Sequence, residues 1–301
     1  MEVISRIAGI ILPVFLIIAA GYVYARLRGE QVAEDMAGIS RVNVELLSPV
    51  LLFSALASRD FDLAANLPLI LAGILISLGS GLLAWPVARL LGYDPRTFVP
   101  PMIYNNCGNM GVPLIVLAFG ASALSEAVAM YVAGTLVYFT VGIWIIESGR
   151  KGPRLSMRRT LANPIIMSVL LGILFAAFRI PLPTMLLQAM RMLGEAAIPV
   201  MLIALGVRMV DVSFAHWRIG LVGAVVCPLS GLIVAWGVDQ WLVLSATQRG
   251  QMYLFAVLPP AVFSFMIAGA YKQEPDKVAA IVMLGNLAAL VFVPLGLWFG
   301  L

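Results

Sequence analysis

The stretch VPPMIYNNCGNMGVPL, residues 99–114, interrupts a segment that is otherwise apolar enough to cross a membrane. It holds three prolines, two glycines and three asparagines. Proline removes a backbone hydrogen-bond donor and clashes with the preceding turn, so a helix is expected to break here. In lipid, the freed backbone groups need partners, and a broken helix is tolerated only inside protein or beside a water-filled cavity. The stretch therefore predicts a specialised point within a membrane protein.

The composition of the rest of the chain supports this class. The chain has 301 residues, of which 62% are hydrophobic and 11% are charged. Apolar runs of about 20 residues recur along it, and each is long enough to cross a bilayer as a helix. The first run lacks a clear signal-peptide cleavage site and is taken as a span. We expect an all-α polytopic membrane protein with ten transmembrane helices, at residues 6–26, 36–57, 67–90, 98–119, 123–147, 161–179, 184–207, 217–238, 249–270 and 277–299.

Several kinds of site are excluded by residues that the chain lacks. Cys107 and Cys227 both lie in apolar segments, so a structural disulfide is not expected. His216 is the single histidine, which excludes a metal site built from several histidines. The sequence has no H-E-x-x-H zinc motif and no G-x-S-x-G elbow, so a membrane enzyme is disfavoured. We expect no cofactor and no metal.

The basic residues predict the orientation in the membrane. The linker at 148–160 carries five of them, so the positive-inside rule places it in the cytoplasm. With the other loops included, thirteen basic residues, Arg208 among them, are placed inside and four outside. Both termini are predicted to be external, in a multi-pass protein of the plasma membrane. Because topology accounts for the positive charge, no nucleic-acid partner is expected.

An internal repeat divides the chain into two halves. RVNVELLSPVLL at 41–52 matches RMLGEAAIPVML at 191–202 in five residues, and the third and eighth spans share glycines at the same offset of 150 residues. The sequence therefore predicts a first five-helix repeat at 1–147, the cytoplasmic linker at 148–160, and a second repeat at 161–301. Because five is odd, the second repeat enters the membrane inverted, which is the construction of secondary transporters.

The fourth and ninth spans are then equivalent, and both are interrupted. The ninth contains Pro259 and Pro260 near its middle. Paired broken helices point to a binding site at the bilayer midplane. A break exposes a half-helix N-terminus with free N–H groups and a partial positive charge. Neutral amide donors from Asn105, Asn106 and Asn109 suit an anion that must be bound and released, so a small carboxylate is expected. The alternative is that the prolines and glycines serve only close helix packing.

The chain resembles the auxin efflux carrier family over essentially its whole length, and three stretches carry the resemblance. NCGNMGVPL at 106–114 resembles the family's N-x-G-x-x-G-x-P motif, and residues 258–271 look like its ninth-span crossover segment. ANPIIMSVLLGIL at 162–174 resembles the segment that comes after the family's central basic loop. Relatives in this family include plant auxin exporters and bacterial permeases for malonate and malate. The resemblance implies a scaffold of spans 1, 2, 6 and 7 that carries a homodimer contact. It also implies a transport domain of spans 3–5 and 8–10 that moves by an elevator-type step.

The resemblance also assigns residues to the site at the crossing of spans four and nine. By position, Asn106 matches the motif asparagine expected to bind the substrate carboxylate. Bacterial relatives often have an asparagine where this chain has Phe263, which weakens a simple malonate assignment and favours a larger or partly apolar acid. Tyr138, in the fifth span, is a further candidate. The expected substrate-binding set is Asn105, Asn106, Gly108, Asn109, Gly111, Pro113, Tyr138, Pro259, Pro260, Phe263 and Ser264.

The sequence leaves open which ion is coupled to transport and what the charged residues within the spans do. The distantly related sodium–bile acid symporters need an acidic sodium ligand in the ninth span. This chain has no acidic residue between Met252 and Tyr271, so sodium coupling is disfavoured and proton coupling stays open. Arg41 with Glu45, and Arg191 with Glu195, are spaced i,i+4 and are expected to form scaffold ion pairs or to serve gating or proton linkage. A channel or sensor that uses the same pocket is the remaining alternative.

Overall fold

The computed structural model describes residues 2–29, 31–58, 61–148, 164–211 and 214–300. The described residues are almost wholly helical, and their β-type pairing is a single isolated bridge between Asn105 and Pro260. The predicted basic linker at 148–160 lies outside the described residues, except for residue 148. The all-α prediction is confirmed for the part of the chain that is described.

Each of the ten predicted ranges contains helix. The α-helices of the first half are α1 (Glu2–Arg28), α2 (Gln31–Val42), α3 (Ser48–Leu56), α4 (Leu63–Leu90), α5 (Pro95–Ile103), α6 (Val112–Phe119), α7 (Leu124–Val137) and α8 (Ile143–Glu147). Those of the second half are α10 (Pro164–Phe178), α11 (Thr184–Arg208), α12 (Trp217–Asp239), α13 (Ala246–Ala256), α14 (Val262–Ala270) and α15 (Pro275–Gly300).

Seven of the described helical segments are long and apolar enough to cross a membrane. They lie at 9–28, 35–56, 63–90, 121–147, 184–208, 217–239 and 275–299. The other three predicted spans consist of shorter pieces: α5 with α6, the 15-residue α10, and α13 with α14. Large apolar side chains stay exposed around the outside, for example Leu82 at 75% and Trp236 at 65%. A chain with this surface is a multi-pass membrane protein.

Three short π-helical turns interrupt the helices, and the sequence analysis did not predict them. They lie at Asn43–Leu47 between α2 and α3, at Cys107–Gly111 before α6, and at Tyr138–Gly142 between α7 and α8. A π-helical turn adds a residue to the turn and rotates the following side chains, and such turns are frequent at functional sites. All three contribute residues to the lining of the cavity described below: Asn43 and Val44 from the first, Gly108 and Asn109 from the second, and Phe139 from the third.

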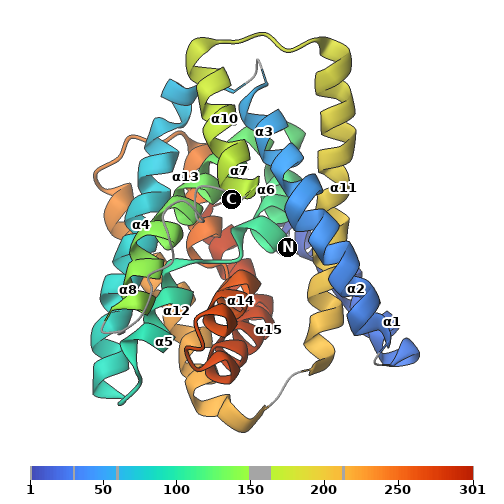
Figure 1. Cartoon of the computed structure of the whole chain (residues 1–301). Coiled ribbons are helices and arrows are strands. Elements are labelled where there is room, and N and C mark those ends of the chain that lie inside the picture. Colours follow the sequence, from blue (N-terminus) through green and yellow to red (C-terminus); the bar gives the residue numbers. More distant parts are fainter. Residues whose placement is uncertain (1, 30, 59–60, 149–163, 212–213, 301) are drawn as a thin grey trace.

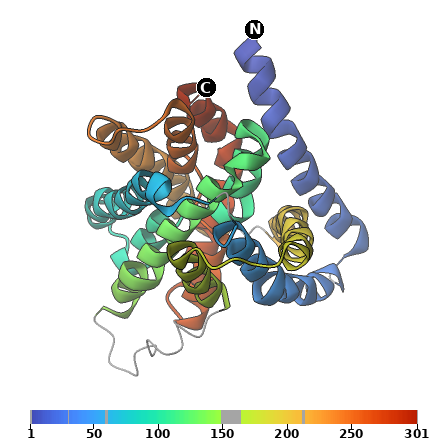
Figure 2. The same cartoon turned by 90° about the horizontal axis from the view of Figure 1, so that it is seen from above.

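The helices form two groups that pack side by side (Figures 1 and 2). In one group α11 packs against α1 and α3, and α10 packs against α3. In the other, α4 packs against α5, α7 and α12, and α15 packs against α12 and α13. Glycines permit the closest approaches: a Cβ at Gly206 would collide with the Ile18 carbonyl, and one at Gly231 with the Ala256 carbonyl. Each collision would be with backbone, so neither helix pair can accommodate a larger residue without moving apart.

Local signals explain where several helices begin. The Asp62 side chain accepts hydrogen bonds from the N–H groups of Ala64 and Ala65 at the start of α4. Ser245 and Gln248 form a reciprocal capping box at the start of α13. Asp94 caps α5, with Pro95 in the first turn. The caps of α5 and α13 fix the outer ends of the two helices that lead to the breaks.

Candidate functional site

The two interrupted segments cross and bond to each other. Between α5 and α6 and between α13 and α14 the backbone leaves the helix. There the Asn106 N–H donates to the Pro259 carbonyl at 2.6 Å, and the Ala261 N–H donates to the Tyr104 carbonyl at 2.8 Å. Backbone groups freed by the prolines thus find partners in the opposite break, as a buried broken helix requires. The crossing that the family resemblance implied is present.

The amides at the crossing are tied down by hydrogen bonds. Asn105 Nδ2 donates to the Phe255 carbonyl at 2.7 Å, and Asn106 Nδ2 donates to Asn286 Oδ1 at 2.8 Å. Asn286, on α15, itself donates to the carbonyls of Pro260 at 3.2 Å and Val282 at 2.8 Å. Because two carbonyls must face its Nδ2, the orientation of the Asn286 amide is determined, and its oxygen is left to accept from Asn106. The amide nitrogens of Asn105 and Asn106 each keep one further hydrogen for another acceptor.

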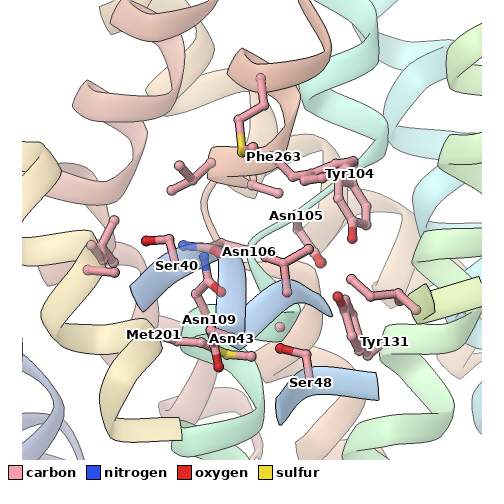
Figure 3. Close-up of a pocket in the computed structure, with 18 of the residues that line it drawn as sticks. Ser40, Asn43, Ser48, Tyr104, Asn105, Asn106, Asn109, Tyr131, Met201 and Phe263 are labelled. Atoms are coloured by element: carbon pink, nitrogen blue, oxygen red, sulfur yellow. The ribbon is translucent and has the colours of Figure 1, made fainter. Parts of the chain in front are cut away.

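A cavity of about 80 Å³ lies beside the crossing. This is room for several water molecules or a compact ligand. One side, here called the crossing wall, is formed by Tyr104, Asn105, Asn106, Gly108, Asn109, Ala261, Val262 and Phe263. The other side, here called the opposite wall, is formed by Ser40, Asn43, Val44, Ser48, Met201, Ala204, Leu205 and Arg208 of α2, α3, α11 and the turn between α2 and α3. Figure 3 shows Ser40, Asn43 and Ser48 facing the three asparagines of the crossing.

Five of the eleven predicted site residues line this cavity: Asn105, Asn106, Gly108, Asn109 and Phe263. Asn109 is partly exposed to it, whereas Asn105 and Asn106 are buried at its edge. Gly108 lies against the Tyr131 ring, so a larger residue there would have to displace that ring. The aromatic Phe263 gives the crossing wall an apolar end.

The other predicted site residues lie behind the lining. Gly111 packs on Leu258, and Pro113 is buried in the first turn of α6. Pro259 and Pro260 pack against Gly285 of α15. Tyr138 is fully buried and stacks on Tyr104, with ring centroids 4.5 Å apart. Ser264 is buried, and its hydroxyl has no hydrogen-bond partner among the described residues.

The structure adds residues that the sequence analysis missed. Asn286 orients Asn106, and the signal for it was an amide in the middle of an apolar span. Asn43 and Ser48 lie within the repeated stretch 41–52, which was examined only as a repeat. Arg208 was assigned to a cytoplasmic loop, but it ends α11 and lines the cavity.

The first of the two predicted i,i+4 ion pairs is absent from the structure. Arg41 and Glu45 are both exposed, and no ion pair joins them. The π-helical turn that begins at Asn43 changes the register between them, so the i,i+4 spacing no longer brings them together. Arg191 and Glu195 are both exposed residues of α11, and the pairing between them stays a prediction.

A polar cluster joins two loops at the far ends of the broken spans. Arg96 and Asp94 form a salt bridge at 2.7 Å, and this guanidinium holds the pKa of the Asp94 carboxyl below its ordinary value of 3.8. Gln273 donates to Asp94 at 3.1 Å, and Thr97 donates to Glu274 at 2.6 Å. The start of α5 is thereby tied to the loop after α14, which helps to hold the two broken helices in register.

The described residues contain no group of three histidine, cysteine or acidic side chains that could hold a metal ion. Cys107 and Cys227 are buried free thiols, in agreement with the prediction that they form no disulfide. The polar side chains that the described residues contribute to the cavity are amides, hydroxyls and one guanidinium. This set can bind an anion but offers no nucleophile with an adjacent base.

The fold and the crossed breaks define a polytopic membrane protein of the kind that moves solutes across a bilayer. A family model described as "Membrane transport protein" matches residues 7–155 and again residues 153–297. The chain therefore belongs to this membrane transport family, which is the auxin efflux carrier family, and it is not an enzyme. The double match also confirms that the two halves of the chain are repeats.

Similar proteins cover the chain almost from end to end. An "Uncharacterized transporter" of Methanothermobacter thermautotrophicus is 26% identical over 95% of both chains. A protein named "Putative malonate transporter" from Rhizobium meliloti is also 26% identical, over 96% of this chain and 94% of its own. An uncharacterized transporter of Methanocaldococcus jannaschii is 18% identical over 96% of this chain and 97% of its own.

Proposed function

We propose that this protein is a secondary transporter of small organic anions, chiefly carboxylates, with its substrate site in the cavity at the helix crossing. The observation that carries the proposal is the meeting of two broken helices beside a cavity lined by Asn105, Asn106 and Asn109. Half-helix ends and neutral amides favour an anion without binding it too tightly for release. Membership of a membrane transport family is consistent with this use of the site.

The proposed architecture has ten spans in two inverted five-helix repeats. Spans 1, 2, 6 and 7 would form a scaffold, and spans 3–5 and 8–10 a transport domain that carries the site in an elevator-type step. The packing of α11 on α1 and α3 supports the first group, and that of α4 and α15 on α12 supports the second. We further propose a homodimer through the scaffold, external termini in a bacterial inner membrane, and proton rather than sodium coupling.

Short carboxylic acids are the first substrates to test. The malonate in the name of the Rhizobium meliloti relative is one reason, and the small volume of the cavity is another. Phe263 on the crossing wall also allows an acid with a small apolar part. A sodium-coupled acid symporter is the competing proposal, and its transport would require a sodium gradient.

The deciding experiment is counterflow in proteoliposomes. Vesicles preloaded with malonate, malate, an aromatic acetate or a longer acid would receive trace labelled acid outside, with and without proton or sodium gradients. We expect saturable exchange that is lost in Asn106→Ala and kept in Asn66→Ala, because Asn66 is a buried amide of α4 outside the cavity.

Three results would contradict parts of the proposal. Absence of exchange with every acid, from protein that elutes as a single folded species, would reject an organic-anion carrier. Flux that does not saturate would indicate a channel. Unchanged exchange in Asn106→Ala would remove the substrate site from the crossing.

A further inference from the structure

The crossing wall is electrically neutral. Its polar side chains are the amides of Asn105, Asn106 and Asn109 and the hydroxyl of Tyr104. Two of these amides already donate one hydrogen each to the protein, Asn105 to the Phe255 carbonyl and Asn106 to the Asn286 side chain. This wall can hold one carboxylate by neutral donors and half-helix ends, but it supplies no counter-charge.

Among the described residues that line the cavity, the only charged one lies on the opposite wall. Arg208 is the last residue of α11 and is partly buried. None of the ion pairs or hydrogen bonds formed by the described residues includes it. A cation at the edge of a membrane-embedded cavity is costly without a partner, and the cost is recovered when an anion enters. A guanidinium is moreover suited to a planar carboxylate, which it can bind through two parallel hydrogen bonds.

A second uncommitted group lies on the same wall. Asn43 begins the π-helical turn after α2, lines the cavity and is only 5% exposed. Its amide oxygen has no hydrogen-bond partner among the described residues. A buried amide without a partner destabilises the protein unless something else bonds to it. Since either end of an amide can be turned toward a ligand, Asn43 can donate to a carboxylate that Arg208 also binds.

We infer that Arg208 and Asn43 form a second subsite, which binds the second carboxylate of a short dicarboxylate whose first carboxylate is held at the crossing. The inference rests on the proposed function and narrows its substrate class. A monocarboxylate could satisfy only one of the two walls, whereas a dicarboxylate bridges both. Because the walls belong to the two different helix groups, a bridging ligand also links binding to their relative position.

The test compares malonate with malonamate, which has the same shape but replaces one carboxylate by a neutral amide. Affinities would be measured by titration calorimetry on the purified protein in detergent. We expect malonate to bind at least about tenfold more tightly than malonamate, the gain typical of one charge-assisted hydrogen bond. Arg208→Gln should remove this difference by weakening malonate alone. Asn106→Ala should weaken both ligands.

Two further variants control for charge and folding. Arg218→Gln removes an equal charge from an exposed position at the start of α12, next to Trp217 and outside the cavity, and should keep the malonate preference. Arg208→Lys keeps the charge without the planar fork, so it should keep the preference with several-fold weaker binding. If Arg208→Gln does not fold, Arg208→Lys takes its place in the test. Equal affinity of Arg208→Lys for malonate and malonamate would then overturn the inference.

The outcomes separate this inference from the proposed function. Malonate binding that is unchanged in Arg208→Gln but lost in Asn106→Ala would overturn the second subsite and leave the crossing site standing. Equal affinity of the native protein for malonate and malonamate would do the same. If the native protein binds neither these ligands nor any other carboxylate, both the inference and the proposed function fall.

Discussion

The two walls of the cavity use asparagine in opposite ways. On the crossing wall, Asn106 is bonded to Asn286, which is bonded in turn to two backbone carbonyls. On the opposite wall, Asn43 is as deeply buried but its oxygen has no partner among the described residues. The crossing wall is therefore preorganised by the protein, whereas the opposite wall depends on a ligand to satisfy its polar groups.

This difference teaches how stability and binding can be separated in one site. Groups that are bonded to the protein stabilise the ligand-free fold, so their loss should be felt without any ligand. Groups that lack a protein partner destabilise the ligand-free fold, so their loss should stabilise the ligand-free protein while it weakens binding. Variants on the two walls should therefore change the same measurements in different directions.

The largest effect is expected where the crossing wall is positioned by backbone. Gly231→Ala would drive a methyl group of α12 into the carbonyl of Ala256, at the end of α13 just before the break. Overpacking of this kind costs about 1–3 kcal/mol or more, and here it should also displace the crossing and abolish binding. Gly237→Ala, on the same helix but with nothing within 4 Å, is the matched control and should fold and bind normally. Unfolding midpoints in detergent and malonate titrations measure both effects.

Asn286→Leu tests the preorganised amide network. The substitution keeps the branched shape of the side chain, with a larger volume, but leaves Asn106 Nδ2 and the Pro260 carbonyl without their partner. We expect the ligand-free protein to lose about 1–3 kcal/mol of stability, together with much of its affinity for carboxylates. Chemical unfolding without ligand is the measurement, and a variant as stable as the native protein would show that the crossing wall is not preorganised.

Asn43→Leu applies the same substitution to the opposite wall and should change stability with the opposite sign. Removal of a buried polar group without a partner should stabilise the ligand-free protein by about 1 kcal/mol. The further stabilisation that malonate gives the native protein should shrink in this variant. A loss of ligand-free stability comparable with that of Asn286→Leu would erase the distinction between the walls.

The smallest effect is expected at the polar cluster that joins the two broken spans at their far ends, away from the crossing. The Arg96 guanidinium lowers the pKa of Asp94 below 3.8, so the charged carboxylate stabilises the fold at neutral pH. The contribution is complete above the ordinary pKa and is lost as the pH falls through the lower, folded-state value. Asp94→Asn should therefore cost about 0.2–1 kcal/mol at pH 7, and the difference from the native protein should fade as the pH falls below 3.8. A difference that does not change with pH would mean that the hydrogen bond to Gln273, rather than the charge, supplies the stabilisation.

The predictability of the site follows from how far apart its members lie in the chain. Asn105, Asn106, Gly108 and Asn109 could be found because their break is encoded locally, by prolines and glycines within an apolar run. Asn286 could not, since it lies 180 residues from Asn106 and only folding brings the two together. Arg208 was taken for a loop cation because residue type and position alone do not reveal the cavity it lines.

The sequence by itself determined the membrane class, the repeat and the places where two spans break, because hydropathy and proline act within a few residues of the chain. Tertiary structure alone decided which groups face one another across the cavity. The π-helical turn at Asn43 and the close packing of α11 on α1 and α3 set the opposite wall, and both depend on contacts between distant segments. Local chemistry thus marks where a site can form, and packing of remote helices supplies the partners, because a side chain's hydrogen bonds are made in space and not along the chain.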